Sequence, residues 1–230
     1  MIVYVNGDSH AAAAEAVNPH AFAEDDGFYW GLGRQPHPDN LRVSFGCELA
    51  NHLNAVLECG AESASSNSRI LRTSREWLSC NHADLVVIQW STWEREEWQY
   101  NGITYQVNGS GIDHVPPEAA ERYRNYIIGL DWLQKTQEAH NNIWKFHQEL
   151  LVQNIPHVFF NGNNDFSSIT DQKDWGVNYI NPYNPNGTFN SVIRTNGFNT
   201  VNPNSWHFGP DAHCFWANYM LQYITDNKLI

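Results

Sequence analysis

The chain alternates short runs of consecutive apolar residues with longer segments in which apolar positions repeat at helical spacing. The short runs are rich in Val, Ile and Phe, which is typical of parallel strands buried on both faces. This alternation predicts an α/β fold, a three-layer α/β/α sandwich around a central parallel sheet. The predicted strands are 2–6, 55–59, 83–90 and 156–161, and the predicted helices are 10–17, 44–54, 68–79, 117–153 and 210–225.

Three segments interrupt this pattern and predict long loops within a single domain that spans residues 1–230. They are 18–41, 91–115 and 162–203, all rich in Gly, Asn, Pro and aromatic residues. The last two follow the carboxyl ends of predicted strands, where open α/β sheets bind ligands. We therefore expect an aromatic-walled cleft at that edge; the alternative is that the rings pin the loops to the core. The rings are Trp90, Trp93, Trp98, Tyr100, Trp175, Tyr179 and Tyr183.

Composition and charge narrow the classes of partner. The net charge of −12 argues against nucleic acid, because its phosphates would be repelled. No apolar run approaches the roughly 20 residues of a membrane span. We expect no signal peptide, because Met1 leads directly into a predicted strand, and hence synthesis in the cytoplasm. The cysteines lack metal or disulfide spacing, so we expect reduced thiols and neither a metal nor another cofactor. They are Cys47, Cys59, Cys80 and Cys214.

The first turn of the chain carries a candidate nucleophile. Gly7-Asp8-Ser9 follows the first predicted strand and precedes an alanine-rich segment. A serine at this point has its hydroxyl above the carboxyl edge of the sheet, with its backbone N–H available to a developing oxyanion. The alternative is a serine that only caps a helix.

The last part of the chain carries a candidate base. Asn204, His207 and His213 precede and enter the last predicted helix. Together with Gly7-Asp8-Ser9, this arrangement resembles the SGNH, or GDSL-like, hydrolase family. In its last block that family has Asp-x-x-His and a small residue ten places after the histidine, a spacing that His207 and Ala217 reproduce. The resemblance implies an SGNH-type α/β/α fold, Ser9 as nucleophile and His207, rather than His213, as catalytic histidine.

The family's other positions are changed in this chain. Its acid falls on Asn204, and an amide can orient an imidazole but cannot stabilise the imidazolium. Its second-block glycine, an oxyanion-hole donor, falls on Ala64, which keeps the backbone N–H. Its third block, Gly-x-Asn-Asp, falls on Ser91 and Trp93, so the side-chain donor is absent. A literal Gly-x-Asn-Asp occurs at 162–165, after the fourth strand, and makes Asn164 a further candidate to line the site.

Other residues are candidates to compensate for these changes. Arg95, Ser65 and Asn67 are candidate oxyanion donors, and Asp211 or Asp165 is a candidate carboxylate for His207. A hydroxyl oxygen of Ser9 within about 3.2 Å of a His207 ring nitrogen would support a working nucleophile.

Two functions from different classes follow from these residues. The first is a serine esterase that removes acetyl or other acyl groups from a carbohydrate through an acyl-Ser9 intermediate. The second is a catalytically impaired module of the same fold that binds a glycan or a virion protein through its aromatic loops. The retained Ser9 and His207 favour the first function, and the missing family Asn and Asp favour the second. The variant second and third blocks resemble divergent SGNH-like proteins of tailed bacteriophages, which would place synthesis in the host cytoplasm. The sequence does not predict an oligomeric state.

Overall fold

The computed structural model describes residues 1–23 and 35–230, and its centre is a four-stranded parallel sheet. The strand order is β2-β1-β3-β6. β3 and β6 are buried along their whole length, which explains their unbroken apolar sequence. All four predicted strands are confirmed. They are β1 (Ile2–Asn6), β2 (Val56–Cys59), β3 (Leu85–Trp90) and β6 (His157–Asn161).

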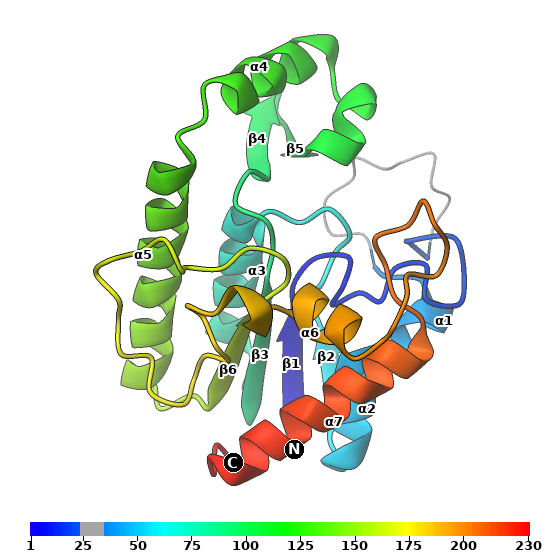
Figure 1. The fold of residues 1–230 in the computed structure, drawn as a ribbon, viewed down its shortest axis with the longest axis vertical. Coiled ribbons are helices and arrows are strands. Elements are labelled where there is room, and N and C mark those ends of the chain that lie inside the picture. The colour runs from blue at the N-terminus through cyan, green and yellow to red at the C-terminus, as the bar shows by residue number, and fades with distance from the viewer. Residues whose placement is uncertain (24–34) are drawn as a thin grey trace.

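Helices cover both faces of the sheet and make the three predicted layers (Figure 1). One face packs against α2 (Phe45–His52), α6 (Phe189–Thr195) and α7 (Pro210–Asp226). The opposite face packs against α3 (Asn67–Cys80) and α5 (Trp132–Val152). Helix α1 (Pro38–Leu41) is a single turn.

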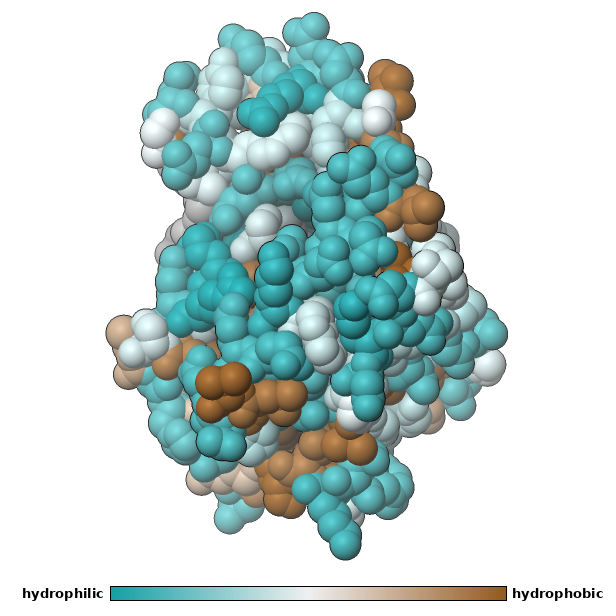
Figure 2. Space-filling model, turned by 90° about the vertical axis from the view of Figure 1, so that its left-hand side faces the viewer, coloured by the Kyte–Doolittle hydropathy of each residue, from teal (hydrophilic) through white to brown (hydrophobic). Residues whose placement is uncertain are grey.

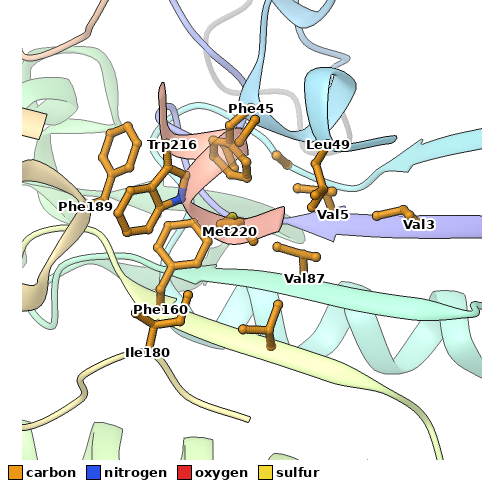
Figure 3. Close-up of a cluster of buried hydrophobic side chains, with 14 of the residues drawn as sticks. Val3, Val5, Phe45, Leu49, Val87, Phe160, Ile180, Phe189, Trp216 and Met220 are labelled. Atoms are coloured by element: carbon orange, nitrogen blue, oxygen red, sulfur yellow. The ribbon is translucent and has the colours of Figure 1, made fainter. Parts of the chain in front are cut away.

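The core on the α7 side is built from large rings and branched aliphatic side chains. In Figure 3, Trp216 lies among Phe45, Phe160 and Phe189, while Val5 and Val87 extend from the sheet towards them. These side chains are at most 1% exposed, so their burial provides the main hydrophobic stabilisation of this face. By contrast, the face of the molecule in Figure 2 is mostly hydrophilic, with hydrophobic side chains in small separate groups.

Two helix predictions need correction. The predicted helix 117–153 is two helices, α4 (Pro117–Ile128) and α5, because Gly129 ends the first and the Asp131 side chain caps the second. The predicted helix 10–17 is a series of turns, because Ala13 and Glu15 have positive φ angles of 50° and 63°. Tertiary packing overrides the high helix propensity of alanine there.

The long segments predicted as loops contain regular structure. Segment 91–115 holds an antiparallel hairpin, β4 (Glu96–Tyr100) and β5 (Ile103–Val107), and the 3₁₀ helix η2 (Gly109–His114). Segment 162–203 holds a parallel bridge from Tyr179 to Phe159, the 3₁₀ helix η3 (Pro185–Gly187) and α6. In segment 18–41, Phe22 bridges to Pro36 and α1 follows, while 24–34 lie outside the described residues.

The hairpin, η2 and α4 together form a cap, residues 96–128, over the carboxyl edge of the sheet (Figure 1). The cap has its own small apolar cluster and is tied to the body by polar contacts. The Arg72 guanidinium of α3 donates to Glu97 of β4 at 2.7 Å, and the Ser66 backbone N–H donates to Gln106 of β5 at 2.9 Å. Lys135 of α5 pairs with Glu96. Among the described residues, no helix is both long and apolar enough to cross a membrane.

Candidate active site

A cavity of about 600 Å³, here called the edge cavity, opens at the carboxyl ends of the strands. Five parts of the chain meet there: the turn after β1, the loop after β2, the segments after β3 and after β6, and residues 204–207. The structure therefore brings together predicted site residues that are far apart in the sequence. These are Ser9, Ala64, Arg95, Asn204 and His207.

Three other predicted site residues do not line the edge cavity among the residues described. Asn67 is occupied with Ser91, accepting from its N–H at 2.8 Å and donating to its carbonyl at 3.1 Å. Trp93 is 3% exposed and stacks on Phe166 with ring centroids 5.0 Å apart. Asn164 lines an adjoining hollow instead.

Ser9 lies on a tight turn that requires a glycine at position 7, two residues before it. A Cβ on Gly7 would lie 2.7 Å from the Ala11 Cβ and 2.8 Å from Gln89 Oε1, so only glycine fits. Ser9 is 5% exposed and lines the edge cavity. Within the described part of the chain, no hydrogen bond joins its hydroxyl to His207, so the expected close contact is not formed here.

The carboxylate that His207 contacts is Glu15. Its Oε2 lies 3.1 Å from His207 Nδ1 and accepts a hydrogen bond from the Ser205 hydroxyl at 2.5 Å. Ser205 Oγ in turn accepts from the His207 backbone N–H at 3.0 Å. The His207 hydrogen bond holds the pKa of Glu15 below its usual value; partial burial opposes this and Ser205 supports it. Glu15 is therefore ionised at neutral pH and fixes the orientation of the imidazole.

The carboxylates and the amide expected beside His207 lie elsewhere. Asn204 is exposed and lines the edge cavity, but its backbone N–H bonds Asn202 and no contact joins its side chain to His207 within the described residues. Asp165 accepts from the Ser167 N–H, and Asp211 is exposed in the first turn of α7. In the sequence, Asn204 falls where the SGNH family has its acid, but in the structure the carboxylate beside His207 is that of Glu15.

Ser9 and Ala64, whose backbone N–H groups are the expected oxyanion donors, both line the edge cavity. Among the described residues, neither the Ser9 N–H nor the Ala64 N–H donates a hydrogen bond. Ala64 has a φ of 70°, a left-handed conformation that glycine adopts more readily, which matches the family's glycine at this position. Ser65 does not line the edge cavity within the described part of the chain: its N–H donates to the Glu62 carbonyl at 3.1 Å, and its Oγ accepts from Arg69 at 3.1 Å.

A fully buried carboxylate, Asp8, supports the Ser9 turn from below. Asp8 Oδ2 accepts from the Ser91 hydroxyl at 2.7 Å and from Arg95 Nη1 at 3.0 Å, and Oδ1 accepts from the His10 N–H at 2.9 Å. Burial raises the pKa of Asp8, but the Arg95 guanidinium and the other partners lower it, and the balance lies below the usual value. Arg95 is thereby anchored at the wall of the edge cavity.

A second histidine, His10, packs beside His207 with ring centroids 5.5 Å apart. Burial lowers the pKa of His10 to about 4, although Asp8 raises it, so the ring is neutral at neutral pH. A neutral neighbour does not oppose the positive charge that a general base acquires on His207. His213 lies deeper, accepts from the Phe45 N–H at 3.3 Å, and has a pKa lowered to about 3 by burial.

The prediction that aromatic rings form the wall of the cleft is wrong for most of the rings named. Trp90 is fully buried, Trp98 packs on Tyr123 and Tyr126, and Trp175 packs with Tyr179 and Tyr183 in the core on the α5 side. The large ring at the edge cavity is Trp206, which is 75% exposed.

Sequence reasoning missed Glu15, His10 and Trp206. Glu15 has one visible signal: with Asp8, it is one of only two carboxylates among residues 1–23. The helix predicted over 10–17 concealed its contact with a residue near the other end of the chain.

Comparisons with known proteins bear on the fold. No family model and no curated protein matches the sequence. An acetyl xylan esterase from Butyrivibrio proteoclasticus aligns with a TM-score of 0.50 at 13% identity, covering 98% of this chain and 63% of that one. This chain thus spans less than two thirds of that protein.

Two further solved structures align over nearly their whole length. One is described as a G-D-S-L family lipolytic protein, from Desulfitobacterium hafniense, with a TM-score of 0.47 at 10% identity, covering 96% of this chain and 98% of that one. The other is the psychrotrophic esterase EstA from Pseudoalteromonas sp., with a TM-score of 0.48 at 12% identity, covering 98% and 97%. At such identities a likeness concerns the fold alone. The fold of this chain is a three-layer sandwich with a central parallel sheet, and it aligns with that of the acetyl xylan esterase at a TM-score of 0.50.

Proposed function

We propose that the protein is a serine ester hydrolase of SGNH type in which Ser9, His207 and Glu15 act together. The observation that carries this proposal is the 3.1 Å contact between Glu15 and His207 Nδ1 in the cavity that Ser9 lines. A nucleophile, a base and an oriented carboxylate are the groups that acyl transfer requires, whatever the fold.

The steps follow from the positions of these groups. With Nδ1 turned to Glu15, Nε2 of His207 remains to take the Ser9 proton as Oγ bonds to the acyl carbon. The N–H groups of Ser9 and Ala64 then bind the oxyanion. His207 returns the proton to the leaving alcohol oxygen as its bond to the acyl carbon breaks. His207 then takes a proton from water as the water oxygen bonds to the acyl carbon. It returns that proton to Ser9 Oγ as the acyl–Oγ bond breaks and the acid leaves.

The absence of a Ser9–His207 hydrogen bond among the described residues is compatible with this mechanism. Hydrogen bonds of catalytic groups are often long in a free enzyme and tighten in the substrate complex. Glu15 also limits the adjustment required, because it already holds one side of the imidazole.

For the substrate, we propose an acylated carbohydrate. Two observations support this: the exposed indole of Trp206 at the edge cavity offers a face for a sugar ring, and Ser63, Asn163 and Asn204 surround the cavity with hydrogen-bonding groups. The related fold of an acetyl xylan esterase makes the same chemistry plausible on this scaffold, but a fold alone does not assign it.

The second candidate is a binding module without catalysis, taking a glycan or a virion protein. The exposure of Trp206 and the lack of a Ser9–His207 hydrogen bond among the described residues favour it. The Glu15–Ser205–His207 arrangement favours the esterase, because a binding surface does not require an oriented imidazole in a cavity that a serine lines.

Labelling and turnover separate the two. The esterase should react with a fluorophosphonate and hydrolyse p-nitrophenyl acetate, and Ser9→Ala should abolish both. His207→Ala should lower kcat by about 10⁴ or more. The control is Ser79→Ala, an exposed serine on α3 that should leave both unchanged. If the wild-type protein shows neither labelling nor turnover of any acylated sugar, the esterase proposal is wrong and the binding module remains.

A further inference from the structure

A second hollow of about 740 Å³, here called the apolar groove, lies between the cap and the start of α5. Its walls are mainly apolar: Ile112 from η2, Tyr123, Ile127 and Ile128 from α4, and Trp132 from α5. Ile128 is 84% exposed and Trp132 is 49% exposed. Large apolar side chains gathered in a concave surface of this size are typical of ligand sites.

The apolar groove is continuous with the edge cavity that holds Ser9. The two hollows share the wall residues Thr92, Glu94, Gly109 and Asn163. A substrate whose ester group lies at Ser9 can therefore extend into the groove without leaving the surface of the protein.

The chemistry of the edge cavity decides which half of an ester faces the groove. His207 protonates the leaving alcohol, so the alcohol oxygen must lie on the side of residues 204–207. Those residues line the edge cavity, and none of them lines the groove among the residues described. In Figure 1 the segment 196–209 and the α4–α5 connection lie on opposite sides of the end of β1. The acyl half therefore points away from His207, towards the groove.

We propose that the apolar groove binds the acyl group of the substrate and selects saturated acyl chains of medium length over acetyl. This inference rests on the proposed esterase function and specifies its substrate. The polar edge cavity beside Trp206 takes the alcohol, and the isoleucines of the cap and Trp132 remove the acyl chain from water.

The test is a series of p-nitrophenyl esters, from acetate through butyrate and hexanoate to octanoate, in which only the acyl group changes. Burial of each methylene should raise kcat/KM by roughly twofold, because the groove is open on one side and full burial would give about fourfold. From acetate to hexanoate the expected rise is on the order of tenfold.

Ile128→Asn and Val152→Asn form a matched pair. Each replaces an exposed β-branched residue at the last position of a helix, with 84% and 83% exposure, but only Ile128 lines the groove. Ile128→Asn should lower the hexanoate-to-acetate ratio of kcat/KM by about fivefold, and Ile128→Asn with Trp132→Ala should lower it further. Val152→Asn should keep the wild-type ratio.

The outcomes separate the inference from the function. If acetate is turned over but kcat/KM is flat or falls with chain length, the groove does not bind the acyl group and the esterase stands. The same holds if Val152→Asn changes the ratio as much as Ile128→Asn. If no ester is hydrolysed and no fluorophosphonate label is taken up, both proposals are overturned.

Discussion

Asp8 and Glu15 lie on either side of Ser9 in one short segment, yet their surroundings differ in almost every respect. Asp8 is fully buried and accepts hydrogen bonds from the side chains of Ser91 and Arg95 and from the His10 backbone N–H. The Glu15 side chain is 35% exposed at the edge cavity and contacts His207 and Ser205. Both carboxylates have lowered pKa values. Burial raises the pKa of Asp8, but its partners, mainly Arg95, lower it by more. The pKa of Glu15 is lowered mainly by its hydrogen bond to His207.

The difference teaches that the hydrogen-bond partner and the burial of a carboxylate, not its residue type, decide whether it stabilises the fold or takes part in a reaction. A carboxylate without solvent contact, paired with an arginine, holds the architecture of the turn. A carboxylate at a cavity wall, paired with an imidazole, can stabilise a charge that develops during a reaction. The comparison therefore predicts that one substitution changes turnover and the other changes stability.

The largest expected effect is on turnover, from Glu15→Gln. Loss of the charge beside the imidazolium should lower kcat by about 10³–10⁴, equivalent to about 4–5 kcal/mol in the transition state. Because Glu15 acts through His207, KM and the melting temperature should change little. The measurements are kcat, KM and Tm on one ester, with Glu121→Gln, exposed on α4, as control. A fall in kcat that only follows a fall in Tm would make Glu15 a structural residue.

The next effect is on stability, from Asp8→Asn. Arg95 would lose its buried counter-charge, so the free energy of unfolding should fall by about 3–5 kcal/mol. Denaturant unfolding measures this loss. The control is Asp39→Asn, which removes an ion pair with the exposed Arg42. Loss of that pair should lower the free energy of unfolding by no more than about 1 kcal/mol.

A double variant sharpens the same comparison. Arg95→Met should recover part of the stability lost in Asp8→Asn, because an unpaired charge costs more than an absent pair. Equal stability of wild type and Asp8→Asn would contradict a supporting role for Asp8.

The smallest effect is expected at Asn204, the family's acid position. Placing a carboxylate there by Asn204→Asp in the Glu15→Gln background should recover about twofold of the lost kcat at most, because an exposed charge that does not contact His207 is screened by water. Measuring kcat of the single and double variants decides the point. Recovery of a hundredfold or more would move the acid of the site from Glu15 to position 204.

Much of the framework could be predicted because its causes are local. Runs such as 83–90 and 156–161 are apolar throughout, since both faces of a central parallel strand are covered, and all four strands are confirmed. Ser9 follows the end of β1 and His207 precedes the start of α7, which was enough to expect them at one edge of the sheet; their catalytic roles stay predictions. The cap hairpin was missed, because its strands are only partly buried and lack the apolar runs of the sheet.

The sequence by itself determined the α/β sandwich and placed a serine near the start and a histidine before the last helix at one edge of the sheet. Only the tertiary structure decided which carboxylate faces that histidine. Helix propensity and family position pointed to 10–17 as a helix and to Asn204 as the orienting group. The physical reason for the difference is that left-handed conformations at Ala13 and Glu15 are unfavourable alone and persist only where surrounding packing imposes them. No local sequence pattern reports such a conformation, and Glu15, whose carboxylate contacts His207, has one.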